Sequence, residues 1–152
     1  MPIKVLELHH HGIRIGTSDE AVEQARTFYT DVLGLDADPG RPQIRGIPGF
    51  WLYVGDKQHT AQIHLMGAEG MSPMARSAKE DPTIPHVALA VEDIQAAKQE
   101  LDQRGIWYWQ IQGLVGQYSD QVFVQDPFGN VIELHQIGTC RCNKAALPEA
   151  ER

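Results

Sequence analysis

The chain has few cysteines, no basic run and no long apolar segment, and each absence narrows its possible functions. Its 152 residues include only two cysteines, Cys140 and Cys142, one residue apart in a polar stretch. This is no disulfide framework: two thiols in such a tail could bind metal but are more often free thiols, and they favour a reducing cytoplasm. Thirteen basic residues against twenty acidic ones give a net charge of −7, so we expect no nucleic-acid partner. No run reaches membrane-spanning length and the start lacks a signal-peptide core, so we expect a cytoplasmic protein without a membrane partner.

The clearest pattern in the sequence is the alternation in residues 85–91. In a strand, its bulky apolar side chains would share one face, and the other face would carry His86 followed by two alanines. Small neighbours leave space above the imidazole, which suits a ligand, although a single strand histidine is more often structural. The same alternation recurs in residues 10–15, where His10 falls in register with His86. An internal repeat is stronger evidence of architecture than a single motif.

The rest of the chain repeats one order of elements in each half, a strand, a helix and further strands. Thr17 begins a capping box that predicts a helix to about Leu33, and Asp93 is the expected N-cap of the second helix. The expected strands are 3–15, 50–54, 60–66, 84–91, 107–111, 121–124 and 131–136. We therefore expect an α+β fold of two βαβββ modules, at 1–67 and 84–138, with a linker at 68–83 and a tail at 139–152.

Three further segments carry a family resemblance that covers about residues 3 to 138. They are Phe28–Leu35 after the first strand, the stretch 49–52 with Gln62–Leu65, and Asp126–Leu134 near the end. With these segments the chain resembles the vicinal oxygen chelate superfamily, which includes glyoxalase I, bleomycin-resistance proteins, fosfomycin thiol transferases and extradiol dioxygenases. The resemblance implies two modules that form cupped mixed sheets with helices on the outer face, and a homodimer.

The resemblance also implies a metal site, because first and last strands of the modules present ligands into the cup. Carried over by position, these ligands are His10, His64, His86 and Glu133. Three imidazoles and one carboxylate suit a divalent ion such as Zn, Ni, Co, Fe(II) or Mn. Glu133 lies between two apolar residues and would be costly to bury without a cation. By the same alternation His9 and His11 face away from His10, and we expect them to be structural or exposed.

By resemblance to glyoxalase I, the chain is expected to be a metal-dependent lyase or isomerase that acts on a small bidentate oxygen substrate through an enediolate. Glu133 would then carry the proton, while Arg14 and Trp51 would bind the substrate. Three positions depart from glyoxalase I: His64 replaces a glutamate, and Ala68 and Pro82 stand where eukaryotic forms have Asn and Arg.

Other members of the superfamily remain alternatives. A ring-cleaving dioxygenase takes its two histidines and one glutamate from a single module, whereas the second half offers only His86 and Glu133. A fosfomycin thiol transferase has Thr at the position of Gly12. A drug-binding protein of the bleomycin-resistance type needs no metal.

Overall fold

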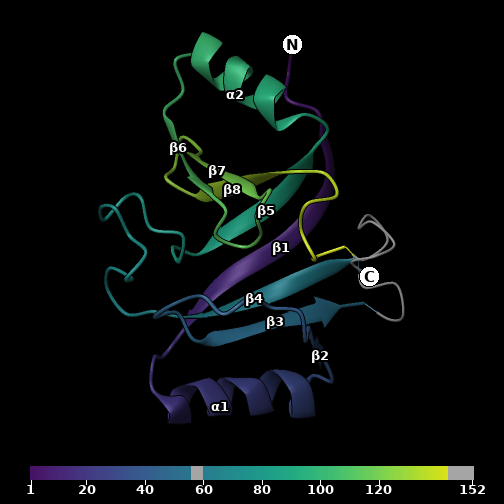
Figure 1. Ribbon diagram of the computed structural model, residues 1–152, viewed down its shortest axis with the longest axis vertical. Coiled ribbons are helices and arrows are strands. Elements are labelled where there is room, and N and C mark those ends of the chain that lie inside the picture. The colour runs from purple at the N-terminus through teal and green to yellow at the C-terminus, as the bar shows by residue number, and fades with distance from the viewer. Residues whose placement is uncertain (56–59, 144–152) are drawn as a thin grey trace.

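The computed structural model describes residues 1–55 and 60–143, and in them the strand–helix–strand order occurs twice (Figure 1). The first half consists of β1 (Val5–Ile15), α1 (Asp19–Thr27), the π-helical turn η1 (Phe28–Val32), β2 (Asp36–Ala37), β3 (Gly49–Val54) and β4 (Ala61–Gly67). The second half consists of β5 (His86–Val91), α2 (Ile94–Gln103), β6 (Tyr108–Gln112), β7 (Asp120–Gln125) and β8 (Val131–Gln136). The expected α+β fold with its βαβββ repeat is confirmed.

All these strands form one mixed sheet in the order β2-β3-β4-β1-β5-β8-β7-β6. The first strands of the two halves, β1 and β5, pair antiparallel at its centre. Each also pairs in parallel with the last strand of its own half, β1 with β4 and β5 with β8. The four strands that were expected to carry ligands are therefore neighbours.

The two faces of the second half carry different side chains. On one face, buried residues of β5, β7 and β8 pack against Ile94, Ala97 and Leu101 of α2. This helix begins at the expected N-cap, where the carboxylate of Asp93 accepts bonds from two backbone amides. The opposite face carries the small cluster Trp109, Phe123 and Val131 and leads into the cup. Alternation along each strand thus separates the packing face from the cup.

The first helix differs from the sequence-based expectation in two ways. Its N-cap is Ser18, not Thr17, and the Ser18 hydroxyl accepts from the Ala21 amide at 3.1 Å. The α-helix ends at Thr27 and continues as η1, and neither contains a buried residue. Phe28 is 51% exposed and Val32 66% exposed. Figure 1 shows α1 and α2 at opposite ends of the molecule, with the sheet between them.

Residues 139–143 of the expected tail fold back onto the cup, while 144–152 lie outside the described residues. Cys140 and Cys142 are both buried and form a disulfide, so the interpretation of these cysteines as free thiols in a tail was wrong. Within the part of the chain that is described, no helix is both long enough and apolar enough to span a membrane.

Candidate metal centre

Strand pairing brings three of the four expected ligands together. His10 of β1 is paired with Ala88 of β5, which is in turn paired with Glu133 of β8. His86 lies two residues before Ala88 on the same face of β5. The side chain of Ala88, at the centre of this arrangement, is only a methyl group. The three longer side chains therefore have room to meet above it.

Three acceptor atoms converge at this point. His86 Nε2 lies 2.9 Å from Glu133 Oε2 and 3.2 Å from His10 Nε2, and His10 Nε2 lies 3.5 Å from the same Oε2. The Nδ1–H of His86 donates to the Ile84 carbonyl at 2.6 Å, so its Nε2 presents a lone pair to the carboxylate. Lone pairs at this separation repel one another unless a proton or a cation lies between them.

The electrostatics of the cluster favour an ionised Glu133 beside a neutral His10. Burial is the largest influence on His10 and lowers its pKa to about 4, against the opposing charge of Glu133. Burial would raise the pKa of Glu133, but the imidazoles of His135 and His10 hold it well below its ordinary value. Burial would lower the pKa of His86, but the hydrogen bond and the charge of Glu133 outweigh it and raise that pKa.

Glu133 is oriented by neighbours that sequence reasoning did not identify as a group. Gln121 of β7 donates from Nε2 to Glu133 Oε1 at 3.0 Å, and His135 Nε2 contacts the same oxygen. The other oxygen, Oε2, is left facing the two histidines. Gln121 gave no sequence signal, whereas the place of His135 two residues after Glu133 indicated a shared face.

The structure fits a divalent ion at this point. Donors bound to one ion at about 2.0–2.2 Å lie roughly 3.0–3.4 Å from each other, and the three distances here are 2.9, 3.2 and 3.5 Å. His10, His86 and Glu133 together form a two-histidine, one-carboxylate set, which leaves positions open for a substrate on an octahedral ion.

The fourth expected ligand, His64, lies in the same cavity but makes different contacts. Its ring stacks on His10 with centroids 3.7 Å apart, and Trp51 stacks on its other side at 4.3 Å. His64 Nε2–H donates to Gln62 Oε1 at 2.8 Å, which directs this nitrogen away from the three converging donors. Burial is the largest cause that keeps the pKa of His64 well below its ordinary value. Its role as a ligand stays a prediction.

The cavity beside these donors combines a polar floor with apolar walls. Trp51 is among its lining residues, as expected of a substrate contact, together with Met66 and Val115. Gln121 also lines it, and its Oε1 has no hydrogen-bond partner among the described residues. A substrate donor group entering the cavity would satisfy this oxygen.

Gly12 leaves the space that the His86 ring occupies. A Cβ at this position would lie 2.8 Å from His86 Cε1 and 3.0 Å from its Nε2. We expect Gly12→Ala to displace the imidazole and weaken metal binding at least tenfold, as measured by titration calorimetry. Gly16→Ala is the matched control, since its Cβ would be similarly crowded, 2.7 Å from Ala21 Cβ, but on a different element. Equal affinities in the two variants would contradict this role.

Arg14 is bonded to the segment before β5, and its expected role in binding substrate stays a prediction. Its Nε donates to the Thr83 carbonyl at 2.9 Å, and its Nη2 donates to Thr83 Oγ1 at 2.8 Å and to Asp81 Oδ2 at 3.3 Å. Asp81 is buried and also accepts bonds from Ser72. Arg14 is not among the described residues that line the cavity.

These contacts change what we expect of Arg14→Leu. The sequence alone predicts a raised Michaelis constant with little change in stability. The structure predicts a loss of about 1–3 kcal/mol of unfolding free energy, because Asp81 loses a charged donor. Urea denaturation measures this loss, with Arg45→Leu as an exposed control. Unchanged stability with a raised Michaelis constant would return Arg14 to the substrate site.

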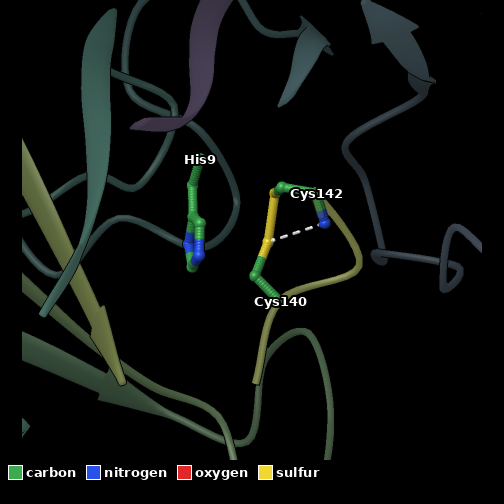
Figure 2. Close-up of side chains that lie close together, drawn as sticks. All are labelled: His9, Cys140 and Cys142. Carbon is green, nitrogen blue, oxygen red and sulfur yellow. Dashed lines mark hydrogen bonds between the residues drawn. A yellow bond between two sulfur atoms is a disulfide. The ribbon is translucent and has the colours of Figure 1, made fainter. Parts of the chain in front are cut away.

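His9 is buried, although alternation alone places it on the face opposite His10, where we expect it to be structural or exposed. Both histidines are buried, with exposures of 1% for His9 and 2% for His10. The pairing of β1 with β5 shifts register between Leu8 and His10, which breaks the alternation. Figure 2 shows His9 beside Cys140 and Cys142, whose sulfurs are joined in a disulfide; with the disulfide reduced, the three would form a compact group of potential metal donors. Burial lowers the pKa of His9 to about 3.

Comparisons with known proteins place this geometry in context. Residues 8–134 match the family model of the Glyoxalase/Bleomycin resistance protein/Dioxygenase superfamily. A comparison with curated proteins gave no match. Methylmalonyl-CoA epimerase from Mycobacterium tuberculosis is 28% identical, with 90% of this chain and 91% of that chain covered and a TM-score of 0.64.

Two other solved structures show the likeness in fold alone. A hypothetical protein from Bacillus halodurans C-125 is 22% identical, with 86% and 93% of the two chains covered and a TM-score of 0.62. The 2,3-dioxygenase LapB from Pseudomonas sp. KL28 is 18% identical, with 88% of this chain but only 41% of that chain covered, at a TM-score of 0.61.

Proposed function

The chain belongs to the Glyoxalase/Bleomycin resistance protein/Dioxygenase superfamily, and we propose that within it the protein is a metal-dependent lyase or isomerase. Its substrate is a small molecule with two neighbouring oxygens, one of them a carbonyl. The reaction moves a proton at the carbon next to that carbonyl, through an enediolate or enolate, as in glyoxalase I.

The convergence of His10, His86 and Glu133 on one point carries this proposal. All three are buried, and their donor atoms lie 2.9–3.5 Å apart, a spacing that suits ligands of one cation. A divalent ion held there would supply a positive centre that stabilises a developing oxyanion. The 28% identity to an epimerase supports the same class of chemistry, since epimerisation also moves a proton at one carbon.

The residues of the chain divide the remaining work. Glu133 Oε2, which is free of Gln121, would be a ligand of the ion at rest and would accept and return the proton once released from it. Gln121 would hold the carboxylate with its amide and orient the substrate with its free oxygen. Trp51 and the apolar wall would exclude water from one side of the substrate.

Metal content and proton exchange test the proposal in two steps. Elemental analysis of protein purified without added ions should find about one divalent ion per chain, and His86→Ala should lose it. The exposed His11→Ala is the matched control and should keep the ion. The wild type is then screened with methylglyoxal and several thiols, and with 2-methyl acyl thioesters, in deuterated water. Deuterium at the carbon next to the carbonyl is the expected result; equal metal content in wild type and His86→Ala would overturn the proposal.

A ring-cleaving dioxygenase is the second candidate. The two-histidine, one-carboxylate set is typical of enzymes that use Fe(II) and oxygen. Oxygen uptake by the Fe(II)-loaded protein with catechols, without proton exchange, would favour it. The third candidate, a drug-binding protein, would bind an aromatic ligand tightly in the absence of metal and would show no turnover.

We also propose that the protein is a homodimer in the cytoplasm. The exposed apolar side chains of η1 and its C-cap, Phe28, Val32 and Leu33, offer a surface that a second copy would cover. Sedimentation at micromolar concentration should give a dimer. A monomer would count against this part of the proposal alone.

A further inference from the structure

The segment 139–143 lies over the cup and brings two sulfur atoms to the histidines. Cys142 is fully buried, and Cys140 is 5% exposed and lines the cavity. Arg141, between them, holds the segment in place through two bonds to the buried carboxylate of Asp38, at 2.8 and 3.0 Å. The ion pair between Arg141 and Asp38, which are 103 residues apart in the chain, thus anchors the segment that carries both sulfurs.

Cys142 lies between two nitrogen donors. Its Sγ is 3.2 Å from His10 Nδ1 and 3.7 Å from His64 Nε2. For a tetrahedral zinc ion, with bonds of about 2.3 Å to sulfur and 2.0–2.1 Å to nitrogen, the sulfur–nitrogen separation is roughly 3.6 Å. The two sulfur–nitrogen distances are therefore close to those of ligands on one ion, and all three atoms lie within 4.8 Å of one another.

We propose that reduction of the Cys140–Cys142 disulfide creates a second metal site, formed by Cys142 Sγ, His10 Nδ1 and His64 Nε2. The ligand set of one thiolate and two imidazoles suits zinc, with the fourth position of a tetrahedral ion left to water. In the disulfide form Cys142 has no thiolate to offer, so the site is closed.

This second site shares His10 with the first one, and because a neutral imidazole has a single lone pair, His10 serves one site at a time. The first uses His10 Nε2 together with His86 and Glu133, and the second uses Nδ1 on the other edge of the ring. His64, whose Nε2 points away from the first site, has its sulfur contact here. On binding an ion, His64 would give up its bond to Gln62 and carry its proton on Nδ1.

The redox step is an exchange with a dithiol. The dithiol gives two electrons and two protons to the Cys140–Cys142 bond, which breaks into two thiols, and the dithiol itself becomes a disulfide. Cys140 lines the cavity, so its sulfur is the one a reductant can attack. The Cys142 thiol then releases its proton to water as the ion binds.

Cobalt reports this site without any substrate. Metal-free protein is reduced with dithiothreitol, freed of it anaerobically, and titrated with Co²⁺. We expect near-ultraviolet thiolate-to-cobalt charge-transfer absorption that saturates at one equivalent for this site and is absent from the oxidised protein. Histidine and carboxylate ligands give no such absorption, so the signal reports Cys142 and not the first site.

The two cysteines provide matched variants. Cys140→Ser leaves the Cys142 thiol permanently free, and should show the absorption without prior reduction. Cys142→Ser should lack it in either state, with circular dichroism confirming that both variants fold. Glu133→Gln, which alters only the first site, should keep the absorption after reduction.

Three results would overturn the proposal. One is absorption of equal strength in Cys142→Ser, and another is its absence from both reduced wild type and Cys140→Ser. The third is an absorption that appears in the reduced wild type but not in Cys140→Ser. That result would mean that the ion is bound by both sulfurs and His9. None of these results depends on whether His86→Ala loses the first ion, so the two proposals fail separately.

Discussion

Glu133→Gln is expected to reduce turnover about a hundred to ten thousand times while the protein keeps at least part of its metal. Glutamine preserves the size of the side chain and one oxygen donor, so His10 and His86 can still hold an ion. It cannot accept the proton that the ionised carboxylate is placed to take. The measurement is the rate of the exchange reaction, compared at equal metal content after both proteins are reloaded.

The control for this variant is Glu92→Gln, which changes an exposed carboxylate paired with Lys4 at 2.6 Å. It should keep wild-type turnover. If reloaded Glu133→Gln also keeps most of its activity, Glu133 only balances the charge of the ion. The base would then have to be another residue that lines the cavity.

The sequence predicted the parts of this site that depend on alternation. Glu133 lies between Ile132 and Leu134, which pack toward α2, and Leu89 and Val91 do the same on the strand of His86, so strand geometry alone sends His86 and Glu133 to the other face. The repeat aligned His10 with His86 in the sequence, and β1 and β5 do pair at the centre of the sheet, where His10 lies opposite Ala88, two residues after His86. Local periodicity and an internal repeat were sufficient for these positions.

The parts that alternation could not predict depend on irregular or distant contacts. A register shift in the pairing of β1 with β5 accompanies the burial of both His9 and His10, which strict alternation does not predict. The contact of Cys142 with His10 spans 132 residues and passes through no repeated motif. Arg14 was placed correctly on its strand, but its partners Asp81 and Thr83 belong to a segment without periodicity. Such contacts depend on the conformations of loops, and the residue pattern of a single sequence does not specify these conformations.

A line of buried polar contacts connects the end of the chain to the cup. Arg141 donates to Asp38, Gln62 Nε2 donates to Asp38 Oδ2 at 3.0 Å, and His64 donates to Gln62. Asp38 also accepts from the Gly40 amide at 2.8 Å. Burial would raise the pKa of Asp38, but these bonds, with that of Arg141 the largest, lower it. The carboxylate thus joins β2, β4 and the segment 139–143.

Asp38→Asn is expected to lower the free energy of unfolding by about 3 kcal/mol, because it leaves the Arg141 charge without its buried partner. For a chain of this length the melting temperature should fall by about 6–12 °C. Since folding lowers the pKa of Asp38, its contribution is complete above the ordinary pKa of an aspartate. It is lost as the pH falls through the lowered value. The gap between wild type and variant in thermal melts should therefore be largest near neutral pH and close at low pH. Asp36→Asn, an exposed change in β2, should melt like wild type throughout. A gap that stays constant down to low pH would show that the carboxylate charge is not what stabilises this connection.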